Sequence, residues 1–229
     1  MFSEENLALL QKIIENDLLI AIWETLYTTI LPTLIAFGIG LPLGILLVTG
    51  EPGGIRPKPR ALMKALNFII NILRSIPFLI LLVMALPLSR ALVGTTVGSK
   101  AVIFPLAIAA FPFVARLVET SVREVDKGVI EAAQAMGASP SQIVFKVLIP
   151  EARPALVSNF VVTLITILGY GAMAGIFGGA GLGAIAINYG YYRTKPLVEY
   201  FAVLLLVVMV QLFQGLGNAL TRKADKRIR

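Results

Sequence analysis

Five long apolar segments alternate with polar ones along the chain, and each is long enough to cross a lipid bilayer as a helix. A membrane-spanning helix needs about 20 consecutive, mainly apolar residues. The five segments cover residues 23–48, 66–88, 101–122, 155–177 and 197–220. The pattern therefore predicts an all-α, polytopic membrane protein with five transmembrane helices, in a single membrane domain over residues 1–229.

The beginning of the chain, residues 1–20, has the pattern of a short amphipathic helix. Leu7, Leu10, Ile14 and Leu18 fall on one side of that helix, and polar residues fall on the other. The segment is acidic, whereas a cleavable signal peptide starts with positive charge, so we expect no such peptide here. We expect the segment to lie on the outer surface of the membrane.

Lysine and arginine residues are distributed unevenly between the two sides of the predicted membrane domain. Three segments together contain fourteen of them: the loop between the first two spans, the region 116–153 and the basic tail 222–229. Only five lie on the opposite side. Cytoplasmic loops carry the excess of positive charge in membrane proteins. The N-terminus is therefore expected outside, and the C-terminus and the loop of residues 123–154 are expected in the cytoplasm.

Composition narrows the functional classes. Hydrophobic residues make up 57% and charged residues 14% of the 229 positions, whereas a soluble domain has about 25% charged residues. The chain has no cysteine and no histidine, which excludes disulfides, thiol and imidazole catalysis and the commonest metal ligands. No nucleophile–base pair is visible, so we expect no catalytic residue, no metal site and no enzyme activity. The net charge of +7 is assigned to basic cytoplasmic loops rather than to nucleic-acid binding.

The predicted cytoplasmic loop, residues 123–154, is too polar to enter lipid but has a helical pattern of its own. A short helix is expected over residues 129–136, ending at Gly137, because glycine adopts positive φ at little cost. Ser139 and Gln142 then match the S-x-x-Q capping box of a second helix, which is expected to end before the proline at position 150. The residues alone leave two interpretations open, which are a loop packed on its own spans and an element that docks on a partner.

The spacing of Glu131-Ala132-Ala133, Gly137 and Pro150 resembles the EAA loop of ABC importer permeases. That signature reads E-A-A, three residues, G, nine residues, I, any residue, L and P. Valine at position 147 and isoleucine at position 149 replace the family's isoleucine and leucine, apolar for apolar. The resemblance implies a coupling helix that docks on an ATPase subunit through Glu131, Ala132, Ala133, Met136, Gly137 and Pro150.

Three further stretches, residues 74–82, 92–98 and 169–193, resemble the five-span permeases of methionine importers. This resemblance implies a bacterial inner-membrane location, a second copy of the chain, two ABC ATPase subunits that bind ATP and Mg, and an extracytoplasmic solute-binding lipoprotein. The chain has no Walker A sequence, so no cofactor is expected in it. The expected function is translocation of methionine or a related amino acid. Permeases for another small polar solute and secondary transporters remain the alternatives.

Two sets of residues within the spans are candidates for the translocation machinery. Glycines recur every fourth residue near the end of the fourth span, where a helix break is expected near Gly178 and Gly179. The candidate gate or dimer interface comprises Gly171, Met173, Gly175, Gly179 and Gly183, with packing inside one chain as the alternative. The candidate pathway lining comprises Asn71, Arg74 and Ser75 on one face of the second span, with snorkelling or structural pairing of the arginine as the alternative.

Overall fold

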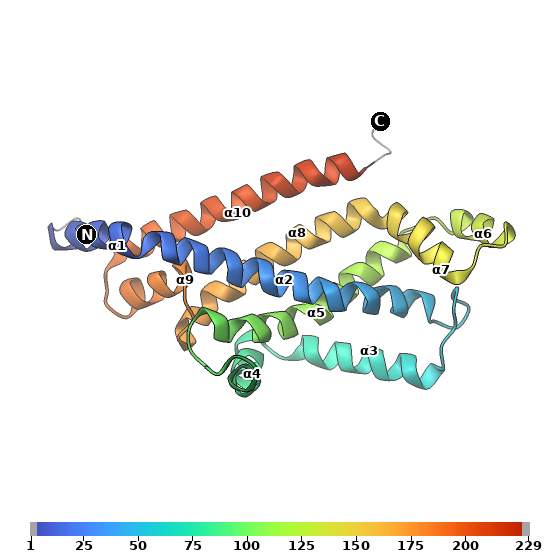
Figure 1. Cartoon of the computed structure of the whole chain (residues 1–229), viewed down its shortest axis with the longest axis horizontal. Coiled ribbons are helices and arrows are strands. Elements are labelled where there is room, and N and C mark those ends of the chain that lie inside the picture. The colour runs from blue at the N-terminus through green and yellow to red at the C-terminus, as the bar shows by residue number, and fades with distance from the viewer. Residues whose placement is uncertain (1–3, 226–229) are drawn as a thin grey trace. The chain divides into compact units, whose positions relative to one another are not determined.

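Figure 1 shows the computed structural model, which describes residues 4–225. Within these residues every regular element is a helix, so the all-α prediction is confirmed. The α-helices are α1 (Glu4–Asn16), α2 (Leu18–Thr49), α3 (Arg60–Ser75), α4 (Phe78–Val93), α5 (Ser99–Arg123), α6 (Lys127–Ala135), α7 (Pro140–Ile143), α8 (Ile149–Ala174), α9 (Leu182–Ile185) and α10 (Pro196–Ala224). Two π-helical turns, Val144–Leu148 and Ala186–Tyr191, and one 3₁₀ turn, Gly175–Phe177, connect some of them.

Four helical segments of the described chain are long and apolar enough to cross a membrane: Leu18–Thr49, Ser99–Arg123, Pro140–Phe177 and Pro196–Ala224. The helices α3 and α4 together make up a fifth, broken span. The expected count of five is therefore reached only when this pair is counted as one span.

The single helix expected over residues 66–88 is instead two helices. Ile76 has extended backbone angles, φ −79° and ψ 124°, and Pro77 caps the start of α4. Proline disfavours the helical conformation in the residue before it, which explains the break at this position. Apolar residues lie on both sides of Arg74 and Ser75, and residues 66–88 are apolar enough overall to fit a single span, so composition did not reveal the interruption.

The second helix expected in the loop of residues 123–154 also differs from expectation, because it does not end before Pro150. Helix α7, the π-helical turn Val144–Leu148 and α8 follow one another without a gap. Pro150 lies in the first turn of α8, directly after the wider turn. Proline has no N–H group to donate to the preceding turn, so one bond of the helical ladder is missing there, next to the π-helical turn where the spacing of the ladder already changes. The end of the loop and the fourth span therefore form one continuous helical segment.

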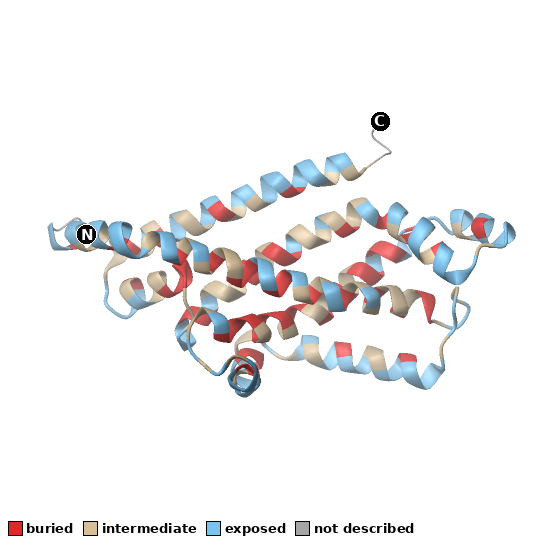
Figure 2. Ribbon diagram, viewed as in Figure 1, coloured by how far each residue is buried: buried red, intermediate tan, exposed pale blue. Residues whose placement is uncertain are grey.

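The described chain forms two compact units. The first contains parts of residues 1–34, 77–109 and 164–215, and the second contains parts of residues 35–76, 110–163 and 216–229. Helices α2, α5, α8 and α10 each contribute residues to both units. Figure 2 shows where buried residues concentrate along these helices.

The first unit has a core built from three of the long helical segments and α9. Ala21, Leu168, Leu182 and Met209 are buried together there. Helix α4 is tied to the start of α5 by the Ser89 hydroxyl, which donates to the carbonyl oxygen of residue 101 at 2.7 Å. Burial of this apolar surface is the main stabilising contribution to the unit.

Helix α1, the short helix expected near the N-terminus, is joined to the segment before α10. The Lys195 ammonium donates to the Glu5 carboxylate at 2.7 Å. This hydrogen bond and the positive charge lower the pKa of Glu5 below its usual value. Because the Glu5 side chain is 81% exposed, the ion pair contributes little to stability.

Helices α2 and α5 are in close contact in the second unit. Its core contains Leu47, Met63, Ile70 and Ala115. A Cβ atom added to Gly44 would lie 2.6 Å from the carbonyl oxygen of residue 115 and 2.6 Å from the Cβ atom of residue 118. The glycine thus lets the two helix backbones approach closely, as small residues do in membrane helix pairs.

We expect Gly44→Ala to lower the stability of the protein, by roughly 1–3 kcal/mol, because the added methyl group overpacks the α2–α5 contact. Gly38 lies on the same helix, and a Cβ atom there would meet nothing within 4 Å. Gly38→Ala is therefore the matched control and should leave stability unchanged or raise it by up to about 1 kcal/mol, because alanine favours the helix more than glycine does. The measurement is the temperature at which the detergent-solubilised chain loses its monodisperse peak in size-exclusion chromatography. Equal melting temperatures for the two variants would contradict the packing assigned to Gly44.

Candidate functional site

The loop between α5 and α8 begins with α6, whose two ends are both capped. The Asp126 carboxylate accepts a hydrogen bond from the Gly128 N–H at 2.6 Å at the start of the helix. At the other end Gly137 has a φ of +78°. Its N–H donates to the Gln134 carbonyl oxygen at 2.9 Å, and the next N–H, of residue 138, donates to the Ala133 carbonyl oxygen at 3.0 Å. These two bonds form a Schellman motif, and they confirm the helix end predicted at Gly137.

The second part of the loop starts with the capping box expected from the sequence. The Ser139 hydroxyl accepts from the Gln142 N–H at 3.3 Å, and the Ser139 N–H donates to the Gln142 side-chain oxygen at 2.8 Å. Pro140 occupies the first helical position. Since α7 continues through the π-helical turn into α8, the loop has a fixed shape on both sides of Gly137.

The six candidate coupling residues differ in exposure. Glu131, Ala132 and Met136 are exposed, and Met136 reaches 81%. Ala133, by contrast, is 5% exposed and packs inside the second unit. Glu131 lines a cavity of about 270 Å³ together with residues 53–55 of the loop between α2 and α3. A partner would therefore contact Glu131, Ala132 and Met136 directly, whereas Ala133 holds α6 in place.

A cluster of polar side chains connects α3 with α5, and sequence reasoning missed it. The Arg116 guanidinium donates to Glu119 at 2.6 Å, to the Asn67 side-chain oxygen at 2.7 Å and to the Asn71 side-chain oxygen at 2.9 Å. Glu119 is only 9% exposed. One of the three candidate pathway residues, Asn71, is thus engaged in structural pairing with Arg116.

The cluster extends to the loop after α2 through a second arginine. Arg123 donates to Glu119 at 2.8 Å and to the Glu51 carboxylate at 3.0 Å. The arginines and the glutamate of α5 stand at positions 116, 119 and 123, so they share one face of the helix. This spacing of charges in an otherwise apolar helix is the signal that would have found the cluster. We refer to Glu51, Asn67, Asn71, Arg116, Glu119 and Arg123 as the α5 charge cluster.

The other two candidate pathway residues lie at the end of α3. Arg74 is exposed. The Ser75 hydroxyl donates to the Asn71 carbonyl oxygen of its own helix at 2.8 Å. The structure therefore places Asn71 and Ser75 in hydrogen bonds of the chain itself, and a role for the three residues in a pathway stays a prediction.

The glycine-rich segment after α8 folds back on itself. The chain turns at Gly178 and Gly181, whose φ values are +74° and +84°. A Cβ atom on Gly175 would lie 2.9 Å from the Ala184 backbone, and one on Gly183 would lie 2.8 Å from the carbonyl oxygen of residue 172. The break expected near Gly178 is confirmed, and the glycines allow the two arms of the turn to pack closely.

The candidate gate residues consequently do not form a single stripe. Gly175 and Gly183 are buried against their own chain, and Gly171 and Gly179 are half-buried. Met173 is the most exposed of the five, at 48%. A contact with a second protomer would therefore involve Met173 rather than the buried glycines.

The turn is held by two side chains of α2 that sequence reasoning did not single out. The Glu24 carboxylate accepts from the Gly181 N–H at 3.1 Å and from the Ser99 hydroxyl at 3.1 Å. The Thr25 hydroxyl accepts from the Leu182 N–H at 2.9 Å. Backbone N–H groups that a helix break leaves free in an apolar environment need such acceptors. An acidic residue at the start of an apolar span was the signal in the sequence.

Comparison with known proteins places the chain in a family. Residues 40–229 match the family model described as "Binding-protein-dependent transport system inner membrane component". A probable D-methionine transport system permease protein MetI from Vibrio cholerae serotype O1 is 45% identical over 215 residues, which are 93% of this chain and 95% of that protein. The corresponding protein from Haemophilus influenzae is 46% identical over 207 residues, or 90% of this chain and 97% of that protein.

Solved structures agree with this placement. A structure of inward-facing conformations of the MetNI methionine ABC transporter matches with a TM-score of 0.88 at 44% identity, over 98% of this chain and 100% of that chain. A crystal structure of an amino acid ABC transporter matches with a TM-score of 0.73 over 90% of this chain, but its 21% identity supports the fold alone. The resemblance to ABC importer permeases seen in the sequence is thereby confirmed. The chain belongs to the family of binding-protein-dependent transport system inner membrane components, and it is a membrane permease subunit rather than an enzyme.

Proposed function

We propose that this chain is the permease of an ATP-driven importer for methionine or a closely related amino acid. The observation that carries the proposal is the capped, rigid loop of α6 and α7, which presents exposed Glu131 and Met136 beside a helix that continues into the fourth span. The similarity to D-methionine permeases over nine tenths of the chain supports the choice of substrate.

The proposed assembly contains two copies of this chain, two ABC ATPase subunits and a solute-binding lipoprotein outside the membrane. ATP and Mg bind to the ATPase subunits, because this chain has no Walker A sequence. The ABC transporter named in the similar solved structure supports this arrangement. The chain is proposed to be one membrane domain, with residues 1–20 at the outer surface and with the loop 123–154 and the tail 222–229 in the cytoplasm. Of that tail, residues 226–229 lie outside the described part.

In the proposed mechanism, closure of the ATPase subunits moves the loop, and the loop moves the fourth span. Glu131, Ala132 and Met136 contact the ATPase, and the buried Ala133 anchors α6 to the second unit. Gly137 fixes the angle between α6 and α7. Because α7 continues through Pro150 into α8, a displacement of the loop reaches the span without a flexible joint.

The glycine-rich turn after α8 is the proposed gate region, close to the contact between two protomers. Its position at the far end of the helix that starts in the loop supports this assignment. Movement of α8 would change the packing between the two arms of the turn. In the state described here, the Glu24 carboxylate accepts from the Gly181 N–H and the Thr25 hydroxyl accepts from the Leu182 N–H.

Uptake into proteoliposomes that contain the permease, its ATPase and its binding protein tests the substrate. We expect labelled methionine to accumulate in an ATP-dependent way, and at least about tenfold more than labelled histidine, glutamate or leucine. If another solute were taken up preferentially, that solute rather than methionine would be the substrate. Uptake without the ATPase would instead indicate a secondary transporter.

Gly137→Val should reduce ATP-driven uptake by about tenfold or more while leaving the amount of folded permease nearly unchanged. A β-branched residue is strained at a φ of +78°, and the strain falls on the loop rather than on the spans. A Cβ atom at this position would meet nothing within 4 Å, so the effect is not one of space. Gly137→Asn is the matched control, because asparagine tolerates this conformation, and it should retain most of the uptake. Normal uptake by the valine variant with the ATPase fully bound would show that the loop does not transmit the movement.

Single cysteines in this cysteine-free chain test the topology and the pairing of protomers. We expect a membrane-impermeant maleimide to label Arg193→Cys in intact cells and to label Arg60→Cys only after permeabilisation. A cysteine at Met173 should crosslink to its copy in a second protomer, whereas one at the buried Ala174 should not. Labelling of Arg60→Cys from outside would reverse the orientation, and the absence of a crosslink at Met173 would remove this residue from the interface.

A further inference from the structure

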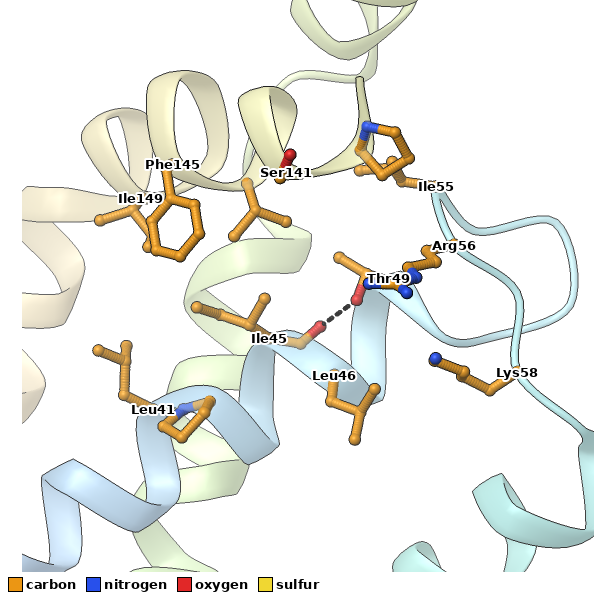
Figure 3. Close-up of a pocket in the computed structure, with 13 residues that line it drawn as sticks. Leu41, Ile45, Leu46, Thr49, Ile55, Arg56, Lys58, Ser141, Phe145 and Ile149 are labelled. Carbon is orange, nitrogen blue, oxygen red and sulfur yellow. Dashed lines mark hydrogen bonds between the residues drawn. The ribbon is translucent and has the colours of Figure 1, made fainter. Parts of the chain in front are cut away.

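A cavity of about 400 Å³ lies in the second unit, between the end of α2 and the start of the helical segment that leads into α8 (Figure 3). One wall is formed by residues 41–49 of α2, and the other by residues 140–149. These are the terminal turns of two of the candidate membrane spans, Leu18–Thr49 and Pro140–Phe177. The cavity therefore lies at the boundary between membrane and loop rather than at the centre of a span.

The part of the cavity nearer the spans is apolar. Leu41 and Ile45 project from α2, and Phe145 and Ile149 project from the opposite wall. The Phe145 side chain is 70% exposed. A large exposed aromatic residue beside an apolar cavity indicates a surface that another apolar group covers.

The part of the cavity nearer the loop is positively charged. Arg56 and Lys58 extend toward the cavity from the loop after α2, on the side away from Phe145 and Ile149 (Figure 3). Within residues 4–225 neither side chain has an ion-pair partner, and no acidic residue lines the cavity. The Thr49 hydroxyl is occupied, since it donates to the Ile45 carbonyl oxygen at 2.9 Å.

An occupant must therefore combine an apolar tail with an anionic head. The volume is within the range of pockets that hold small molecules. Basic pockets at the cytoplasmic ends of membrane helices favour anionic lipid head groups. A free phosphate ion would satisfy the arginine and the lysine but would leave the apolar walls uncovered.

We propose that this cavity binds an anionic phospholipid, with one acyl chain between the α2 wall and Phe145 and with the phosphate against Arg56 and Lys58. The bound lipid joins the end of α2 to the first turns after the capping box of α7. It thereby stabilises the position of the loop from the membrane side. The inference depends on the proposed topology only for the choice of leaflet, and it does not depend on the transported substrate.

The proposal is tested by native mass spectrometry, which measures how much lipid binds to the purified full chain in detergent. The probes are a phosphatidylglycerol and a phosphatidylcholine with identical acyl chains. We expect phosphatidylglycerol to bind at least about tenfold more tightly, because two basic groups near the head group favour the anionic lipid. Equal binding of the two lipids would overturn the proposal.

Charge-neutralising variants separate the site from the general basicity of the loop. The double variant Arg56→Gln with Lys58→Gln should lose the phosphatidylglycerol preference. Arg60→Gln with Lys64→Gln removes the same charge from exposed positions that do not line the cavity, and it should keep the preference within about twofold. An equal loss in both double variants would show attraction to the surface charge rather than a built site.

A photoreactive residue identifies the occupant in the assembled transporter, whether or not the variants above fold well. The exposed Phe145 tolerates replacement by p-benzoylphenylalanine, because little of it is packed. Irradiation in phosphatidylglycerol-containing membranes should attach a lipid to the permease, and phosphatidylglycerol added to phosphatidylcholine vesicles should increase the yield. Crosslinking to the ATPase or to a second copy of this chain in place of lipid would overturn the proposal.

Discussion

The α5 charge cluster is the constraint on which the second unit depends. An apolar helix that carries two arginines and a nearly buried glutamate on one face must supply each charge with a partner, because an unpaired buried charge is very costly. Glu119 is shared between Arg116 and Arg123, and Arg116 also binds two asparagines of α3. Helix α3 is therefore held against α5 by hydrogen bonds as well as by apolar contact.

The cluster also fixes the start of the loop that contains α6 and α7. Arg123 ends α5 and binds Glu51, which lies just after α2. Helix α6 starts four residues later, so the start of the loop is fixed to the loop after α2. The same end of α2 forms one wall of the cavity, opposite Phe145. Charge pairing thus fixes the start of the loop of α6 and α7 to the end of α2.

Local features of the sequence predicted much of the fold and of the loop. Gly137 and the Ser139–Gln142 pair act on residues next to them in the chain, so their spacing is enough to place the caps. The break at Pro77 was missed because apolar residues continue on both sides of it. The pairing of Arg116 with Asn71, and of Glu24 with Gly181, joins residues far apart in sequence. The sequence shows the charged members, Arg116 and Glu24, but their partners depend on packing and cannot be found from spacing.

The π-helical turn Val144–Leu148 affects how the fourth span presents its side chains. A π-helical turn holds about one residue more than an α-helical turn, and one residue corresponds to a rotation of about 100°. A helical wheel drawn without interruption from Ser141 into α8 therefore assigns the residues after Leu148 to the wrong faces. When the extra residue of the turn is taken into account, the residue positions that form each face of α8 are shifted by one relative to those of α7. In this chain, a comparison of faces before and after the turn needs that shift before the two are equated.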